Sequence, residues 1–397
     1  MSVTPLEPTP SPQLTPDERR RRRWLLAILL LLLLLLAAIS YLFIRYLNQP
    51  EPLPELIPVP VEVSYPPRYI FSIYETDSPV GVALSPDGER LYVTEMRGER
   101  LIKIFDRDGN LLDSFAPPRT QAGERAPVYV ATDSKGRVFV TDRLQHAIFV
   151  YDAEGNFLDT ILSPTLSLSE YIAKHTTLAP SPGTFAYNFF QNEVYYQGAD
   201  GKEMTLPRPD DAIWAPLGIR FDSQDRMYLT DLVDKDHSVL VVPAEVVMAP
   251  DWLDFDLNAL KFGTSGQGNG QFLFPNAALP DSQGRIIVSD GNNGRLSVWN
   301  DRGEFLFHFG VGTGEGALNL PRGMAIDHRD RLHVVDAVGQ TVRVYDFSDE
   351  NPAFLYTFGV LGSQGGQFNY PNDIALDATG RVYVADRENN RIQVWTY

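Results

Sequence analysis

The chain has 397 residues, 44% of them hydrophobic, and a formal net charge of −17 at pH 7. This length and apolar content allow a sizeable buried core in one or two domains. The absence of cysteine excludes disulfides, zinc–thiolate sites and a cysteine nucleophile. Residues 1–46 carry a net charge of +3, so the rest of the chain carries −20 and would repel phosphate backbones. We expect no binding to nucleic acid.

The N-terminal region has the pattern of a membrane anchor. Residues 1–23 form a proline-rich tail, predicted to be disordered, that ends in five consecutive arginines. Residues 24–44 are almost uninterrupted apolar, and a helix of that length spans about 30 Å, the thickness of the bilayer hydrocarbon core. A cleaved signal peptide is the alternative, but its apolar region is usually about 7–15 residues long.

The charges around the apolar run predict its orientation. Because positive charge stays on the cytoplasmic side, the arginines indicate a cytoplasmic N-terminus and an extracytoplasmic remainder. Residues 45–67 are proline-rich and are predicted to be an extended stalk. The expected location is the plasma membrane as a single-pass protein. The lack of cysteines and of Asn-x-Ser/Thr sequons favours a bacterial envelope.

From residue 68 onward, a set of short β-type runs repeats six times. Each unit has an Asp/Gly turn followed by a strand that ends in an acidic residue, as in "GRVYVAD". A third and usually a fourth strand follow. Four antiparallel strands in each repeat of about 50 residues predict an all-β fold, a six-bladed β-propeller. The acidic residues that end the second strands are Glu95, Asp142, Asp231, Asp290, Asp336 and Asp386.

Three glycine-rich stretches separate the later units, starting at Phe262, Phe309 and Phe358. A phosphate-binding loop would need a helix after the glycines, and no helical pattern follows. We interpret the stretches as crossovers between blades, in which glycine permits positive-φ turns. The Phe of "GQF" is expected to pack between blades, and the proline limits the ladder before the next strand.

The last unit carries the motifs "FG…GQF…P…IALD", "GRVYVAD" and "NNRIQVW". In these motifs the chain resembles the NHL-repeat family of β-propellers, and the resemblance covers residues 68–397. It implies a six-bladed ring but no single function. The last unit stops after three strands, so we expect the segment from Tyr69 to Tyr74 to supply the missing strand and close the ring.

One segment departs from the repeat. Between Asp142 and Asp231 the spacing is nearly two periods, and the excess is mostly residues 164–214. A seventh blade would explain this length, but the segment lacks the turn and strand markers of the other units. We therefore expect an insertion, including a hairpin within 192–206, that serves as a lid or a docking surface.

Polar residues in the loops before the first strands are the candidate binding residues at the mouth of the central channel: Asn276, Arg322, Asn372 and Asp373. Related six-bladed lactonases bind a metal at such a mouth. Asn276, Asn372 and Asp373 have oxygen atoms that could ligate calcium or another divalent cation. Only the fourth and sixth units supply such ligands clearly, so no cofactor is predicted.

The second-strand acids are expected to be structural. An arginine follows five residues later in three units, which predicts the pairs Glu95–Arg100, Asp290–Arg295 and Asp386–Arg391. Two function classes remain. The first is a membrane-anchored extracytoplasmic module or scaffold that binds a protein, carbohydrate or other ligand. The alternative is a metal-assisted hydrolase or lyase, lactonase-like or amidating-lyase-like, with its site at the channel mouth.

Overall fold

The computed structural model describes residues 15–48, 65–163, 168–175, 186–198, 200–209, 214–233, 236–247 and 259–397. The chain forms two compact units, Met1–Pro58 and Val59–Tyr397. The first contains α1 (Pro16–Asn48). Within α1, Arg19–Ile44 is long and apolar enough to cross a membrane, as a membrane anchor or a signal sequence would be. Most of the predicted stalk and of the N-terminal tail lies outside the described residues.

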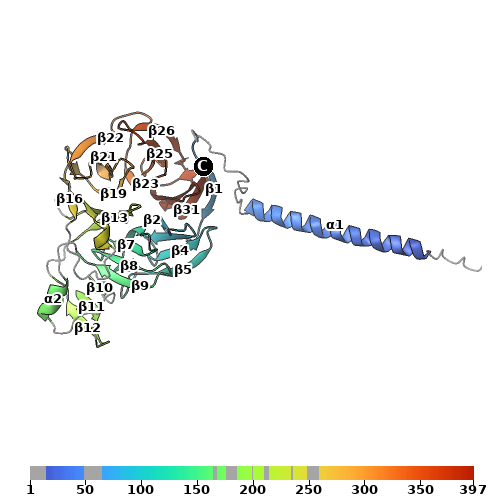
Figure 1. Cartoon of the computed structure of the whole chain (residues 1–397), viewed down its shortest axis with the longest axis horizontal. Coiled ribbons are helices and arrows are strands. Elements are labelled where there is room, and N and C mark those ends of the chain that lie inside the picture. The colour runs from blue at the N-terminus through green and yellow to red at the C-terminus, as the bar shows by residue number, and fades with distance from the viewer. Residues whose placement is uncertain are drawn as a thin grey trace, which may run out of the picture. The chain divides into compact units, whose positions relative to one another are not determined.

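The second unit contains six four-stranded antiparallel sheets among the described residues, which we call blades 1 to 6 (Figure 1). Blade 1 is β2 (Pro79–Leu84), β3 (Arg90–Glu95), β4 (Ile102–Asp106) and β5 (Leu111–Phe115). Blade 2 is β6 (Pro127–Thr132), β7 (Val138–Asp142), β8 (Ala147–Tyr151) and β9 (Phe157–Ile161). Blade 3 is β13 (Pro216–Phe221), β14 (Met227–Asp231), β15 (Ser238–Val242) and β16 (Leu260–Phe262), with the short helix α3 (Ala244–Val247) before its last strand.

Blade 4 is β19 (Pro275–Pro280), β20 (Ile286–Asp290), β21 (Arg295–Trp299) and β22 (Phe305–Phe309). Blade 5 is β23 (Pro321–Ile326), β24 (Arg331–Asp336), β25 (Thr341–Asp346) and β26 (Ala353–Phe358). Blade 6 is β29 (Pro371–Leu376), β30 (Arg381–Asp386), β31 (Arg391–Thr396) and β1 (Arg68–Ile73). The first strands contact one another in the cyclic order β2, β6, β13, β19, β23, β29 and back to β2, so the ring is closed.

The predicted closure of the ring is confirmed. β1 pairs antiparallel with β31, with Arg68 opposite Thr396 and Ile73 opposite Ile392. The side chain of Ile73 is buried with residues of blades 1 and 6. The first strand of the second unit thus completes the blade that holds the C-terminal strands.

All six first strands begin with a proline, and in each the pairing with the second strand shifts within the next three residues. Proline has no N–H to donate, so it fits the first position of a strand, where no ladder bond is needed. Hydroxyls on the second strands then join neighbouring blades. Thr94 donates to the carbonyl of Val128 at 2.6 Å, and Thr141 donates to that of Leu217 at 2.7 Å.

The glycine-rich crossovers are built as the sequence predicts. Phe272 and Phe368, the Phe of each "GQF", are fully buried between blades 3 and 4 and between blades 5 and 6. These two crossovers also hold a two-residue parallel bridge each, β17 (Thr264–Ser265) with β18 (Gln271–Phe272) and β27 (Val360–Leu361) with β28 (Gln367–Phe368). Short 3-10 turns, η1 (Gly291–Asn293) and η2 (Arg387–Asn389), follow the second strands of blades 4 and 6.

A substitution at Gly359 tests this packing. Gly359 has φ +78, and a Cβ there would lie 2.2 Å from the ring of Phe368. We expect Gly359→Ala to lower the free energy of unfolding by about 2–3 kcal/mol, because backbone strain and overpacking add. Gly88→Ala is the matched control, because its φ is +74 and no atom lies within 4 Å of its Cβ. Urea unfolding should show a loss of only about 1 kcal/mol for the control; equal losses would contradict the packing role.

The segment between blades 2 and 3 forms a side structure outside the ring. Its described parts are α2 (Leu168–His175) and a three-stranded sheet of β10 (Ala186–Asn188), β11 (Glu193–Gln197) and β12 (Glu203–Pro207). Its residues Tyr187, Tyr196 and Leu206 pack in one cluster with residues of blades 1 and 2. β6 contacts β13 directly, so this segment does not contribute a blade to the ring (Figure 1). The rest of 164–214 lies outside the described residues.

Candidate functional site

The central channel is lined by the six first strands, and these strands contain only three charged residues. They are Arg220 on β13, Arg322 on β23 and Asp373 on β29. Because side chains alternate along a strand, Asp373 and Ala375 of β29 share a direction, as do Gly218 and Arg220 of β13. Arg220 and Asp373 therefore point towards the channel, whereas Arg322 stands at the same strand position as Asn276 and Asn372.

The predicted mouth residues use their polar atoms inside the protein. Asn276 is fully buried, accepts a hydrogen bond from Nη1 of Arg322 at 2.7 Å and donates to the carbonyl of Phe274 at 2.8 Å. Asn372 is buried and donates to the carbonyl of Val80 at 2.7 Å. Both side chains thus join the first strands of neighbouring blades, Asn276 through Arg322 and Asn372 through Val80.

Asp373, the fourth predicted residue, is also fully buried and forms the main ion pair of the channel. It accepts the N–H of Val82 at 3.0 Å and pairs with Nη2 of Arg220, which sequence reasoning missed. The guanidinium of Arg220 also lies 5.7 Å from the centre of the Tyr129 ring. Burial raises the pKa of the Asp373 carboxyl, and the positive charge of Arg220 opposes this rise. The pair links β29 and β13, which stand apart in the ring.

The six second-strand acids accept backbone N–H groups of the loops that precede the first strands. Asp142 accepts from Ala126, and Asp336 accepts from Leu320 at 3.0 Å. These bonds join the crossovers to the loops after the second strands, so both kinds of loop lie on one face, which we call the crossover face. The other four acids make the same kind of bond: Glu95 with Asp77, Asp231 with Ala215, Asp290 with Leu273 and Asp386 with Asn369.

The structure contains two of the three predicted ion pairs of these acids. Nε of Arg295 lies 2.9 Å from Asp290, and Nε of Arg391 lies 2.7 Å from Asp386. The prediction of the third pair, Glu95 with Arg100, is wrong, because Glu95 pairs with Lys103 at 2.9 Å. Arg100 instead donates to the carbonyl of Arg125. Lys103 lies opposite Val93 on the adjacent strand, and this pairing brings its ammonium to Glu95.

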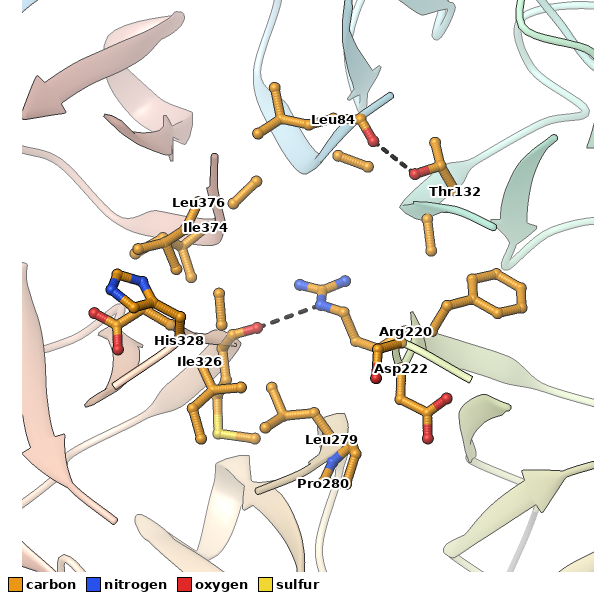
Figure 2. A pocket seen from close by; sticks show the side chains of 18 of the residues that line it. Leu84, Thr132, Arg220, Asp222, Leu279, Pro280, Ile326, His328, Ile374 and Leu376 are labelled. Atoms are coloured by element: carbon orange, nitrogen blue, oxygen red, sulfur yellow. Dashed lines mark hydrogen bonds between the residues drawn. The ribbon is translucent and has the colours of Figure 1, made fainter. Parts of the chain in front are cut away.

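A cavity of 640 Å³ opens at the opposite end of the channel, on the face of the turns between first and second strands. We call this the turn face. The walls are largely aliphatic, with Leu84, Leu279, Ile326, Ile374 and Leu376 around the opening (Figure 2). The space exists because four of the six residues at the fifth position of the first strands are alanines. That position holds Ala83, Ala131, Arg220, Leu279, Ala325 and Ala375, which all line the cavity.

The side chain of Arg220 reaches into the middle of this cavity (Figure 2). It is 14% exposed, and its Nε donates to the carbonyl of Met324 at 3.3 Å. His328 lies on the wall across from it (Figure 2). The sequence signal for this site was weak, because an arginine near the end of an apolar strand resembles a solvent-exposed residue.

The two faces differ in their exposed apolar side chains. In the described part of blades 1 to 6, six large apolar residues on the crossover face are exposed, while the other exposed ones lie on outer strands. On the crossover face, Leu361 is 66% exposed and Val360 is 58% exposed. The six residues are Tyr74, Phe274, Val311, Val338, Val360 and Leu361. On the outer strands they are Leu111, Leu112, Leu306 and Leu355.

The described residues contain no group of three or more His, Cys, Asp or Glu side chains that could hold a metal ion. His333, on β24, is fully buried. Nδ1 of His333 must donate to the carbonyl of Arg331, at 3.0 Å, so Nε2 accepts the hydrogen bond from the Tyr397 hydroxyl. This contact joins blade 5 to the end of β31 in blade 6. Burial lowers the pKa of His333 to about 4.

His333 should make the propeller less stable in acid. The unfolded chain takes up a proton on this side chain below a pKa of about 6.5, whereas the folded protein does so only near 4. Between pH 7.5 and pH 5, this difference should reduce the free energy of unfolding by about 2 kcal/mol. Asp142 acts in the opposite direction, because burial raises its pKa to about 6.

The measurement therefore compares wild type with His333→Phe by urea unfolding at both pH values. The variant should be less stable at pH 7.5, since the hydrogen bond to Tyr397 is lost, but should lose about 2 kcal/mol less on acidification. Identical pH dependence in the two proteins would show that His333 is not the titrating group.

Comparisons with known proteins agree with this architecture. Residues 368–395, within blade 6, match the NHL repeat. A segment of 101 residues is 33% identical to the protein brain tumor of Drosophila melanogaster. The matched segment is 25% of this chain and 9% of that protein. Streptogramin B lyase superposes with a TM-score of 0.51 at 13% identity, covering 83% of this chain and 98% of that one. A catalytically inactive virginiamycin B lyase from Staphylococcus aureus with quinupristin gives 0.50 at 14%, covering 82% and 98%.

At such identities the likeness to the two lyases shows the fold alone. The repeat match and the closed ring of four-stranded blades both indicate a β-propeller. The chain is therefore a β-propeller protein that carries an NHL repeat at residues 368–395.

Proposed function

We propose that this protein is a membrane-anchored binding module whose propeller docks a protein partner through the crossover face. The observation that carries the proposal is the exposure of Val311, Val338, Val360 and Leu361 on that face. Val360 and Leu361 are adjacent in the chain, and clusters of exposed apolar side chains are typical of surfaces that bind other proteins. Glycines beside them fix the loop shape through backbone conformation alone.

The apolar helix supports the membrane part of the proposal. Arg19–Ile44 has the length and composition of a membrane span, and five arginines stand at its N-terminal end. By the positive-inside rule this charge favours a cytoplasmic N-terminus and an extracytoplasmic propeller. The acidic remainder of the chain suits a partner with a basic surface around an apolar centre.

The metal-assisted hydrolase or lyase is less well supported. Asn276 and Asn372 are buried in hydrogen bonds between blades, and Asp373 pairs with Arg220. A calcium site there would require these contacts to break. Melting curves in calcium and in chelator test this alternative, and a stabilisation by calcium that Asp373→Asn abolishes would favour it.

Site-specific photo-crosslinking in the native membrane tests the docking face. A crosslinker at Leu361 should capture a discrete protein adduct. The same group at Leu306, an exposed leucine of outer strand β22, is the control and should not. Val360→Asp should abolish the adduct without changing the melting temperature. Equal labelling from both positions would contradict a docking role for the crossover face.

A further inference from the structure

The cavity at the turn face has the size and lining of a small-molecule site. Its volume of 640 Å³ lies within the usual range for ligand pockets, and its walls are mainly aliphatic with few polar groups. It is open to solvent on the turn face and is bounded at depth by the Arg220–Asp373 pair. Nothing in the NHL repeat match requires a cavity here, because the match describes strands of a single blade.

The acidic residues around the opening are not available to a ligand. Asp222 accepts the N–H groups of Gln224 and Arg226 and also the Nε–H of Arg226. Asp281 and Asp327 make the same set of bonds within their own turns. Asp330 accepts the N–H and the hydroxyl of Ser282 from the neighbouring blade. These carboxylates hold the turns together, so they do not form a cation site.

Arg220 is different, because its hydrogen-bonding capacity is not used up. A guanidinium has five N–H donors. Within the described residues, Arg220 donates one to Met324, one to the carbonyl of Ile219 and one to Asp373. One N–H on Nη1 and one on Nη2 remain, so this side chain can still donate two hydrogen bonds to a carboxylate.

The other arginine of the first strands, Arg322, lies near the start of β23 and does not line the cavity. Asp373 neutralises one of the two arginines on the first strands, and Arg322 makes its bonds to neutral groups, the Asn276 amide and the Tyr370 hydroxyl. Nε of Arg322 is buried and has no partner among the described residues. Among the described residues that line the cavity, Arg220 is the only arginine or lysine.

We propose that the turn-face cavity binds a small apolar monocarboxylate. Its carboxylate accepts the two remaining N–H groups of Arg220, and its apolar body lies in the space left by the alanines, against Leu279, Ile326 and Ile374. His328 lines the wall across from Arg220 and contributes a second polar contact near the opening. Recognition thus combines one charge-assisted, two-point contact with burial of a short aliphatic or aromatic body.

Calorimetric titration of octanoate into the full chain in lipid nanodiscs tests the proposal, with empty nanodiscs as the blank. We expect saturable binding of octanoate at one site, and at least tenfold weaker binding of octanol and octylamine, which have the same chain without the carboxylate. Equal binding of the three compounds, or no saturable binding of octanoate, would overturn the proposal.

Three variants locate the site. Arg220→Met combined with Asp373→Asn removes the guanidinium without leaving a buried charge unpaired, and octanoate should bind at least tenfold more weakly. Ala375→Phe leaves Arg220 in place but fills the cavity, and it should weaken binding to a similar extent. Arg329→Ala removes an exposed arginine of the same face that does not line the cavity, and its binding should be unchanged. Binding that survives both cavity variants, or that falls equally in Arg329→Ala, would place octanoate elsewhere and refute the proposal.

Discussion

A propeller that lacks residues 1–73 should melt about 10 °C below one that lacks only residues 1–67. The two truncations differ by β1, the strand that pairs with β31 and completes blade 6. Its loss exposes the edge of β31 and removes the buried side chain of Ile73 from the cluster between blades 1 and 6. Burial of one such side chain and the ladder hydrogen bonds together contribute about 5 kcal/mol. For a domain of this size, that loss corresponds to a drop of about 10 °C in melting temperature.

The shorter truncation is the control, because it removes the apolar helix and the stalk while leaving the ring closed. It should keep a single cooperative transition. The longer truncation should also broaden the transition, because blade 6 then ends in an unpaired strand. Coincident melting curves for the two proteins would mean that β1 does not hold the ring together.

The six blades could be predicted because the repeat places the same residue types at the same structural positions. A proline starts every first strand, and an acid ends every second strand. These choices are local: the proline needs no partner, and the acid binds backbone N–H groups about 16 residues earlier, as Asp142 does with Ala126. Ring closure was predictable for a similar reason, since an incomplete last blade requires one more strand.

The chemistry of the channel could not be predicted in the same way. Asn276 and Asn372 are polar residues at the same position of blades 4 and 6, and Asp373 follows Asn372, which suggested converging ligands. Their partners in other blades, however, are far away in the chain: Arg322 is 46 residues from Asn276, and Val80 is 292 residues from Asn372. Such pairings depend on which residues the neighbouring blade, or for Asp373 the opposite blade, places beside them. A single repeat unit holds no information about them.

The same reasoning explains why the cavity was missed. It is defined by small residues, and an alanine in a strand gives no sequence signal of its own. Only the ring places Ala83, Ala131, Ala325 and Ala375 around one axis, beside the single arginine at the equivalent position of β13. The expected site was thus assigned to the crossover face, whereas the cavity opens on the turn face.

Breaking the Arg220–Asp373 pair from one side should strongly destabilise the propeller. Arg220→Met leaves the fully buried carboxylate of Asp373 without its counter-ion, and a buried pair broken in this way typically costs about 3–5 kcal/mol. Asp373→Asn leaves Arg220 charged, but that side chain reaches the cavity and water, so the expected loss is smaller, about 1–2 kcal/mol.

The double variant, Arg220→Met with Asp373→Asn, should recover much of the stability lost in Arg220→Met, because no charge remains buried without a partner. Urea unfolding of the four proteins at pH 7 gives the coupling energy directly, and we expect about 2 kcal/mol or more. The pH dependence adds an independent check. In Arg220→Met the pKa of Asp373 should rise further, so acidification should stabilise this variant relative to wild type, since protonation removes the unpaired charge. Additive single losses and an unchanged pH profile would mean that the two groups do not interact across the channel.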